Sequence, residues 1–294
     1  HFAVVGFTNL SQDHLDFHKD MEDYFAAKAK LFTFEYADLA VINLDDPYGK
    51  RLAAQTELPV VTLSRLDTTA TWHYASIASD YVGASVSIRG SGGILIEGKT
   101  ALHGGFNYDN LLMAVAIAVE SGIDPIDIAA ILPTLTGAAG RLEAVRLGQN
   151  FSALVDYAHS PDAVKRVLEA AAEITDGKVI AVLGCGGDRD KTKRSLMGQA
   201  LHKGADIAIY TSDNPRSEKP EEILVQMVLD IDVLPPSEVI VDRAQAIRTA
   251  VNLAKAGDVV MVLGKGHEKG QEINGQIHEF DDRIELAKAI EDKK

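Results

Sequence analysis

Cysteine is almost absent from this sequence, and so is any long apolar run. The 294 residues include a single cysteine, Cys185, which excludes a disulfide framework and fits a reducing compartment. No segment approaches the roughly 20 consecutive apolar residues that a membrane helix needs. No segment at the start of the sequence has the charged-then-apolar pattern of a secretion signal. We therefore expect a cytoplasmic protein without membrane insertion.

Basic side chains are also few. The sequence has 29 Lys and Arg against 43 Asp and Glu, which gives a formal net charge of −14 at pH 7. A surface this negative repels a phosphate backbone, which argues against nucleic acid as a partner. An anionic small ligand must then be held by glycine-rich backbone or by a local basic cluster. One such cluster follows a glycine turn and consists of Arg189, Lys191, Lys193 and Arg194.

Hydrophobic residues make up 46% of the chain, enough for two domains with cores of their own. In the second half, apolar runs predict strands at 154–158, 179–184, 207–212, 238–242 and 259–264. Segments of helical period separate them, at 161–175, 193–204, 220–231, 243–256 and 282–292. This alternation predicts an α/β fold with a doubly wound parallel sheet. Ligands bind at the carboxyl ends of such strands, so we expect the site in the loops 184–190, 212–216 and 264–268.

The first half predicts a different arrangement. Strands at 3–8, 39–44 and 59–63 alternate with helices at 20–34 and 48–56, and two more helices follow at 107–121 and 124–135. Between them, residues 72–102 alternate without helical period, which predicts an antiparallel β insertion. The domain boundary is expected at 137–141, giving domains 1–137 and 138–294. The sequence enters a strand directly after His1, without an initiator methionine, so we expect a fragment cut within a domain.

Residues 93–100, GILIEGKT, formally match a phosphate-binding P-loop. That motif needs a glycine-permissive loop between a strand and a helix, so that backbone amides converge on phosphate. Here the interior is a strand-forming Ile-Leu-Ile run, and the residues that follow cannot open a helix. We predict a β-hairpin at 93–100, and we expect any cradle for the γ-phosphate of ATP to lie upstream of His1.

Two polar stretches stand out in the first half. Asp13, His14, Asp16 and His18 crowd together after a strand, where they could ligate a divalent metal or organise phosphates; solvated acids at a capped helix start are the competing interpretation. Asn107 and Asn110 lie on the first turn of an apolar helix. Their amides suit the edge of an adenine, while helix capping is the commoner use.

Further candidates lie in the second half. Arg141 could meet a phosphate or ribose, Asp156 could accept ribose hydroxyls, and Tyr157 could flank a base. In SDNPR (212–216), an acid, an amide and an arginine surround a proline, a set that can recognise an ammonium and a carboxylate together. In GKGHE (264–268), two glycines allow close backbone approach, and Glu268 offers a second anion for an ammonium. Cys185 lacks a basic partner by spacing, so we expect a packed small residue there.

Taken in order, these motifs closely resemble those of the Mur ligases, especially the branch that adds a diamino acid. The resemblance runs from about residue 3 to residue 290, and its most specific motifs are DNPR and GCGGDRDK. It implies the latter part of a central, P-loop-type ATPase domain, followed by a Rossmann-like C-terminal domain. The family's first domain and its P-loop would lie outside this sequence.

The resemblance also assigns residues. Lys28 of YFAAKAKLF matches the family's carbamylated lysine, which with His14 would help to hold Mg²⁺. Asn110 would contact adenine, Arg141 and Asp156 would contact ATP, Tyr157 would lie beside it, and His159 would lie near its phosphates. The positions that match those holding the incoming diamino acid are Arg189, Asp213, Asn214, Pro215, Arg216, Gly264 and Glu268.

The implied reaction joins an amine to a carboxylate at the expense of ATP. The carboxylate of UDP-N-acetylmuramoyl-L-alanyl-D-glutamate attacks the γ-phosphate, and the amine of the amino acid then expels phosphate from the acyl phosphate. Meso-diaminopimelate has a carboxylate at its far end that lysine lacks, so Arg216 favours diaminopimelate, with lysine or ornithine as alternatives. The protein is expected to act as a monomer, and this chain alone is expected to be inactive.

Two other functions remain open from the sequence. A nicotinamide-dependent oxidoreductase would explain the doubly wound half, but the full GxGxxG motif is missing and DNPR would have no role. A non-catalytic module that binds a nucleotide or an amino acid would fit a chain without a P-loop.

Overall fold

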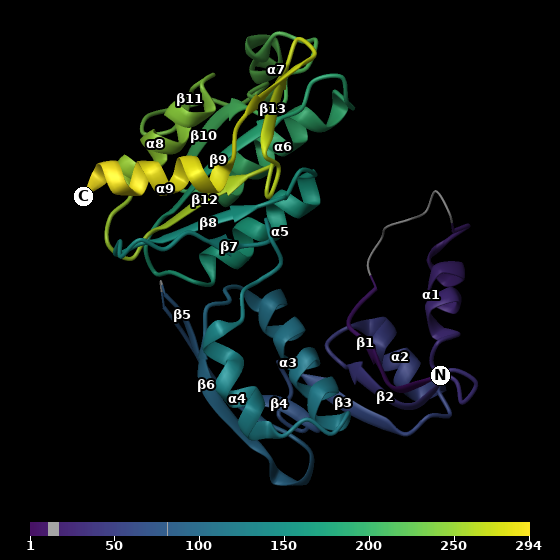
Figure 1. Cartoon of the computed structure of the whole chain (residues 1–294). Helices are drawn as coiled ribbons and strands as arrows, with labels where there is room; N and C mark the ends of the chain where they lie inside the picture. Colours follow the sequence, from purple (N-terminus) through teal and green to yellow (C-terminus); the bar gives the residue numbers. More distant parts are fainter. Residues whose placement is uncertain (11–17, 81) are drawn as a thin grey trace. The chain divides into compact units, whose positions relative to one another are not determined.

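The structure is a computed structural model, and it describes residues 1–10, 18–80 and 82–294. The chain divides into two compact units (Figure 1). The N-terminal unit holds most of residues 1–135, and the C-terminal unit holds residues 136–294 with the short segments 79–82 and 101–104. Within the described ranges, no helix has both the length and the apolar character required to cross a membrane.

In its described residues, the N-terminal unit is built on a sheet whose strands follow chain order. The strands are β1 (Phe2–Phe7), β2 (Ala37–Asn43), β3 (Val60–Ser64), β4 (Trp72–Asp80), β5 (Gly83–Arg89) and β6 (Leu95–Thr100). Strands β1 to β4 pair in parallel, whereas β5 and β6 form an antiparallel pair. The segment 72–102 therefore contains the predicted antiparallel pairing, but it extends the parallel sheet rather than standing apart from it.

Most helices of this unit begin after a capping aspartate. They are α1 (Met21–Ala29), α2 (Pro47–Gln55), α3 (Gly105–Glu120) and α4 (Pro125–Ile131), with 3₁₀ turns at Ser91–Gly93 and Leu132–Thr134. Asp46 caps α2 by accepting N–H groups at its start, with proline in the first helical position. Helix α1 is shorter than the predicted 20–34, because turns replace the helix after Ala29.

The P-loop-like stretch forms a strand. The last six residues of GILIEGKT make up the whole of β6, and Lys99 pairs with Ser85 of β5 in the antiparallel ladder. The next helix begins only at Gly105. The β-hairpin prediction is confirmed, and Lys99 does not stand at the start of a helix where it could meet a phosphate.

The C-terminal unit contains the predicted doubly wound sheet. Its strands are β7 (Glu143–Ala144), β8 (Ser152–Asp156), β9 (Val179–Cys185), β10 (Ile207–Ser212), β11 (Glu238–Val239) and β12 (Val259–Leu263), in the spatial order β11-β10-β9-β12-β8-β7. All but β7 run parallel. Strands β9 and β12 are buried along their whole length, which explains their continuous apolar sequences.

Helices cover both faces of this sheet (Figure 1). The helices are α5 (Pro161–Ala172), α6 (Thr192–Gly204), α7 (Pro220–Met227), α8 (Arg243–Leu253) and α9 (Asp282–Lys293). Apolar side chains of α5, α6 and α7 pack in one core, and those of α8 and α9 pack in the core on the opposite face. Ser160 caps α5 and Pro161 occupies its first position, as the sequence predicted.

A two-stranded hairpin lies outside the main sheet and was missed by the sequence analysis. Strands β13 (Gly270–Ile273) and β14 (Gln276–Glu279) pair antiparallel, joined by Asn274 and Gly275. Both turn residues have positive φ, 51° and 74°. An Asn-Gly pair with this backbone is the usual two-residue hairpin turn, so the signal was present in the sequence.

Candidate active site

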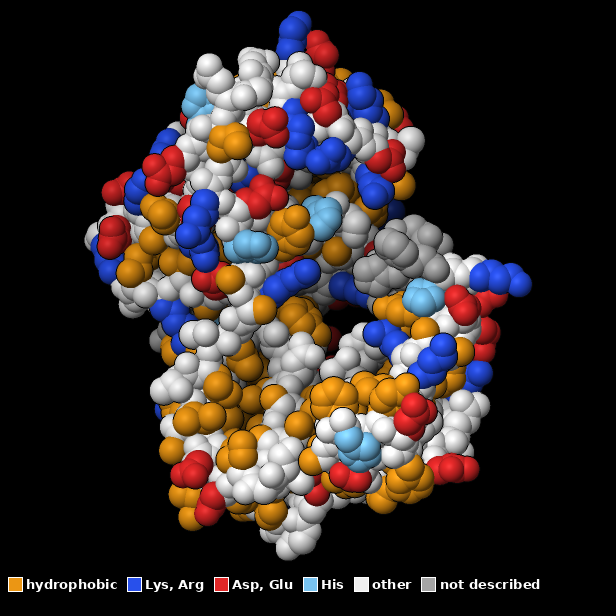
Figure 2. Space-filling view, turned by 45° about the vertical axis from the view of Figure 1, so that its right-hand side comes forward, with side chains coloured by type: hydrophobic (Ala, Val, Ile, Leu, Met, Phe, Trp, Pro, Cys, Tyr) orange, Lys and Arg blue, Asp and Glu red, His pale blue; other side chains and the backbone are white. Residues whose placement is uncertain are grey.

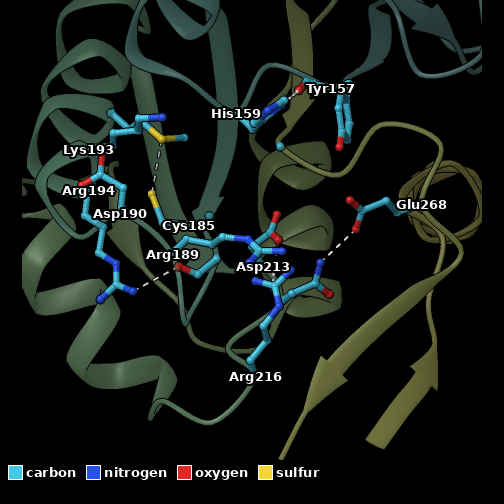
Figure 3. A pocket seen from close by; sticks show the side chains of 15 residues that line it. Tyr157, His159, Cys185, Arg189, Asp190, Lys193, Arg194, Asp213, Arg216 and Glu268 are labelled. Carbon is cyan, nitrogen blue, oxygen red and sulfur yellow. Dashed lines mark hydrogen bonds between the residues drawn. The ribbon is translucent and has the colours of Figure 1, made fainter. Parts of the chain in front are cut away.

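Three loops meet at the carboxyl ends of adjacent strands β10, β9 and β12, as predicted. They enclose a pocket of about 460 Å³ (Figure 3). Its lining comes from the glycine turn after β9, the DNPR segment after β10, the GKGHE segment after β12, the start of α6 and the residues after β8. The residues that carry polar side chains into it include Tyr157, His159, Arg189, Lys193, Asp213, Asn214, Arg216 and Glu268.

Glycines let these loops cross at short range. A Cβ atom on Gly187 would lie 1.9 Å from the carbonyl oxygen of Pro215, and the Gly187 N–H donates to the carbonyl of Asn214. A Cβ on Gly264 would lie 2.9 Å from Oδ2 of Asp213, and Gly264 has a φ of 110°. Any side chain at these two positions would push the DNPR segment out of place.

Two carboxylates and an amide form one wall of the pocket. Asp213 and Asn214 are buried, and Oδ1 of Asp213 accepts the N–H of Asn214 at 2.7 Å. Nδ2 of Asn214 donates to Oε2 of Glu268 at 2.9 Å. Burial raises the pKa of Asp213, although Arg243 and Lys265 act in the opposite direction. Burial also acts to raise the pKa of Glu268, but hydrogen bonds from Asn214 and Lys265 outweigh it and lower the pKa.

Lys265 completes this wall, and the sequence analysis passed over it. Its side chain is fully buried, and Nζ donates to Oδ1 of Asn214 and to Oε2 of Glu268, each at 3.0 Å. Lysines are almost always exposed, so the sequence gives little reason to expect a buried one here. The two glycines on either side of Lys265 are the one local sign.

Arg216 is held in place before any ligand arrives. Its Nε donates to Oε2 of Glu272 at 3.1 Å, and Nη1 donates to the carbonyl of Gly187 at 2.7 Å. Its backbone has a φ of 51° and is fixed to the hairpin, since its N–H donates to the carbonyl of Glu272 and its carbonyl accepts from Asn274. Nη2 forms no hydrogen bond with the described residues, so it can still donate.

The basic cluster after β9 serves two purposes. Arg194 is buried and donates to both oxygens of Glu218, which also accepts from Lys191. The hydrogen bonds from Arg194 hold the pKa of Glu218 well below its usual range. Within the described ranges, only Arg189 and Lys193 of the cluster line the pocket without an ion pair. Lys191 and Arg194 are thus already paired with Glu218.

A second buried ion pair supports the strand ends from behind. Arg243, at the start of α8, donates from Nε and Nη2 to the two oxygens of Asp282, each at 2.7 Å. Nη1 also donates to the carbonyl of Ser212 and Nη2 to that of Leu263, the last residues of β10 and β12. Both side chains are fully buried. The pair ties two of the pocket-bearing strands together, and no motif in the sequence announced it.

Cys185 is a packed residue, as predicted. Its side chain is buried against Met197, with Sγ 3.6 Å from Sδ. Burial raises the pKa of the thiol to about 12. It is therefore protonated at neutral pH, which excludes its use as a ready nucleophile.

The residues predicted to bind nucleotide lie in both units. In the C-terminal unit, the ring of Tyr157 lies 4.5 Å from that of His159, and the guanidinium of Arg141 lies over the same tyrosine at 5.7 Å. Asp156 is buried and accepts the N–H groups of Leu142 and Ala158. These bonds give Asp156 a structural role in holding the GRLE segment against β8, and its contact with ribose stays a prediction.

In the N-terminal unit, Asn110 is exposed on α3 and Lys28 is exposed near the end of α1. Nζ of Lys28 lies 5.0 Å from the centre of the Tyr24 ring, and the His18 ring stacks on Tyr24 at 4.7 Å. His14 lies outside the described residues, as do Asp13 and Asp16. Among the residues that the structure describes, no group of three or more His, Cys, Asp and Glu side chains is arranged to hold a metal ion.

Comparison with known proteins decides the family. A model described as the Mur ligase middle domain matches residues 1–118, and one described as Mur ligase, glutamate ligase domain matches residues 140–266. The chain belongs to the Mur ligase family. This membership agrees with the resemblance carried by DNPR and GCGGDRDK, and it sets aside the oxidoreductase alternative for the doubly wound half.

Two curated relatives and one solved structure that this Mur ligase chain resembles are named UDP-N-acetylmuramoyl-L-alanyl-D-glutamate--2,6-diaminopimelate ligase. The protein of Streptomyces coelicolor is 47% identical over 98% of the chain, and that of Streptomyces avermitilis is 44% identical over 99%. A solved structure with this name is 39% identical over 99% of the chain, with a TM-score of 0.77. The chain spans 58% of the length of the two Streptomyces proteins and 60% of the solved chain.

Proposed function

We propose that this chain forms the amino-acid-binding part, and some of the nucleotide-binding part, of an ATP-dependent ligase. The ligase adds meso-diaminopimelate to UDP-N-acetylmuramoyl-L-alanyl-D-glutamate in peptidoglycan synthesis. The observation that carries the proposal is the pocket at the ends of β9, β10 and β12, where the carboxylates of Asp213 and Glu268 and the guanidinium groups of Arg189 and Arg216 line one cavity. The names of the relatives support the same reaction.

Each charged group in this pocket has a partner in the proposed substrate. The carboxylates of Asp213 and Glu268 would accept the hydrogen bonds of an ammonium, and Gly264 would allow the ligand to approach the backbone closely. Arg216 and Arg189 would bind carboxylates. Pro215 keeps the turn between these groups rigid. The pocket lining thus contains anions and cations together, which suits a zwitterion better than a simple anion.

Diaminopimelate is favoured over lysine by the state of Arg216. Two of its nitrogens already have partners inside the protein, and Nη2 is left with donors to offer. A carboxylate at the far end of the substrate would complete the set, whereas lysine would leave those donors unsatisfied.

The contacts with ATP are proposed on the family resemblance. Asn110 would meet the adenine edge, Arg141 and Asp156 would contact ATP, Tyr157 would lie beside it, and His159 would lie near its phosphates. ATP supplies the activating phosphoryl group, so the substrate carboxylate becomes an acyl phosphate that the amine can attack. The part of this chain's residues is to hold the amine and to orient it toward the carbonyl carbon.

Mg²⁺ is proposed on the family resemblance alone, with Lys28 as its carbamate and His14 as a ligand. In the described part of the chain, Lys28 has an aromatic neighbour, Tyr24, and no second carboxylate or imidazole joins it to form a donor set.

Titration calorimetry of the 294-residue chain tests the amino-acid site directly. Meso-diaminopimelate should bind more tightly than lysine or ornithine. Arg216→Met, which removes the guanidinium, should abolish the preference; Arg248→Met, at an exposed arginine outside the pocket lining, is the matched control and should keep it. Equal binding of all three amino acids, or binding to none, would overturn the proposed function.

Lys28 offers an independent test of the nucleotide half. In the complete gene product, Lys28→Ala should abolish ligase activity, because an anion of the metal site is lost, and short carboxylates added to the assay should restore part of it. Lys30→Ala, two residues further along the chain and also exposed, is the control and should keep full activity. Full activity in Lys28→Ala would remove this residue from the mechanism.

A further inference from the structure

Lys265 has an unusual position for a lysine. No part of its side chain reaches solvent, yet its ammonium contacts two residues of the proposed amino-acid site, Asn214 and Glu268. Gly264 and Gly266 flank it with φ of 110° and 54°, a backbone that glycine adopts without strain and other residues rarely do. The G-K-G backbone is therefore shaped so that the lysine side chain turns inward between two glycines.

The first consequence concerns the amide of Asn214. Its Oδ1 accepts from Nζ of Lys265 and from the N–H of Glu272, each at 3.0 Å. Two donors on one side of the amide fix which end is oxygen and which is nitrogen. Nδ2 must therefore face Glu268, and its second N–H is left for a ligand.

The second consequence concerns the carboxylate of Glu268. Its Oε2 already accepts from both Lys265 and Asn214, at 3.0 and 2.9 Å. No described residue donates to Oε1, so a ligand meets this one oxygen. The negative charge of Glu268 acts to raise the pKa of Asp213, and the positive charge of Lys265 acts to lower it.

We infer that Lys265 is a positioning residue that sets the hydrogen-bonding polarity of the amino-acid site: it turns the Asn214 amide so that a donor faces the ligand and holds Glu268 with one free acceptor oxygen. The inference rests on the proposed function, since it explains how that site is prepared for an ammonium beside a carboxylate. A buried ammonium costs desolvation free energy, and neither partner is part of an apolar core. A role confined to stability would not require both of its bonds to go to ligand-facing groups.

The charge of Lys265 also predicts a pH effect. An ammonium ligand needs Glu268 ionised, and Lys265 is one cause of its lowered pKa. The other charged groups that act on this corner are Asp213, Arg216, Arg243 and Asp282, and they remain when Lys265 is replaced. Without the lysine the pKa of Glu268 rises, so binding fails at a higher pH than in the wild type.

The test compares Lys265→Met and Lys265→Gln with Lys269→Met in the 294-residue chain. Lys269 is exposed in the same loop, so its substitution removes one positive charge without touching the pocket. Calorimetry with meso-diaminopimelate near pH 8 should give roughly 10- to 100-fold weaker binding for Lys265→Met, the usual effect of losing a charged hydrogen bond. Lys269→Met should bind like the wild type.

The pH series separates a positioning role from a structural one. From about pH 8 down to about pH 5, binding to Lys265→Met and Lys265→Gln should fall at a higher pH than binding to the wild type. Thermal unfolding identifies the variants that fold, and Lys265→Gln carries the test if Lys265→Met does not fold. Folded variants that bind diaminopimelate with wild-type affinity, and that lose binding at the same pH as the wild type, would overturn the inference. A wild type that binds no amino acid would instead overturn the proposed function.

Discussion

Two arginines beside the strand ends of the C-terminal unit are used in opposite ways. Arg243 stands at the start of α8, and Arg216 lies in the loop after β10. All three nitrogens of Arg243 donate hydrogen bonds, and its partner Asp282 is fully buried with it. Arg216 is partly exposed, and its Nη2 is not used by the described residues. The arginine whose nitrogens all donate within the protein supports the scaffold, and the arginine with a nitrogen that does not remains able to bind a ligand.

The largest effect in this comparison is expected when Arg243, the fully paired arginine, is removed. Arg243→Ala leaves the carboxylate of Asp282 buried without its partner, and we expect a loss of about 3–5 kcal/mol in the free energy of unfolding. Urea denaturation of the chain measures it. Arg248→Ala is the control, because Arg248 is exposed on the same helix, and it should change stability by about 0.5 kcal/mol or less. A loss for Arg243→Ala no larger than the control's would mean that the pair does not support the strands.

Removing Arg216 should instead change the selectivity for the amino acid. In the complete gene product, Arg216→Ala should lower kcat/KM for diaminopimelate by about 30- to 1000-fold, or 2–4 kcal/mol, since a charge-assisted contact in a closed site is lost. Lysine should be affected far less, because it has no carboxylate at that end. Equal losses for both amino acids would mean that Arg216 only shapes the loop, and a wild type that prefers lysine would show that DNPR was misread.

Glu272 tests whether Arg216 must be held in advance. Glu272→Ala frees Nε of Arg216 and should weaken diaminopimelate binding about 2- to 5-fold, the range of a partly exposed ion pair. Glu272→Gln keeps an acceptor at the same place and should bind nearly as the wild type does. Calorimetry distinguishes the two. Tighter binding by Glu272→Ala would show that Glu272 competes with the substrate instead of positioning the arginine.

The smallest expected effect concerns Glu218, the partner of the third arginine, Arg194. Because its pKa is lowered in the folded chain, its contribution to stability is present above its ordinary pKa and disappears as the pH falls through the lowered value. Glu218→Gln should therefore unfold at a lower temperature than the wild type at neutral pH, and the difference should shrink in acid. Calorimetric melting at neutral and at acid pH measures this difference in unfolding temperature. A difference independent of pH would exclude the ion pair as the cause.

Much of the C-terminal fold was readable from the sequence, and the reason is the simplicity of its signals. Strands such as β9 and β12 are buried on both faces, so their apolar runs are continuous, and helix α5 begins at a cap followed by proline. The convergence of the three loops followed from parallel strands sharing an edge. The segment 72–102 was harder, because alternation predicts a strand but does not say which sheet the strand joins.

The site was readable only where the side chains stand in short motifs. Asp213, Asn214 and Arg216 occur in one turn, whereas the groups that hold them come from far along the chain: Lys265 is 51 positions from Asn214, and Glu272 is 56 from Arg216. A lysine buried by tertiary contacts has no local signature. Glu272 could have been suspected, since the Asn-Gly turn after it announced a hairpin that the sequence analysis overlooked.

That hairpin has a consequence for how substrate choice could be altered. Strands β13 and β14 pair with each other and form no part of the main sheet, yet Gln271 and Glu272 reach the DNPR segment through their side chains. Its residues can therefore be exchanged without rebuilding the folding core. A designer who wished to retarget this pocket to a different diamino acid would begin by grafting positions 270–279 and leave the strand ends alone.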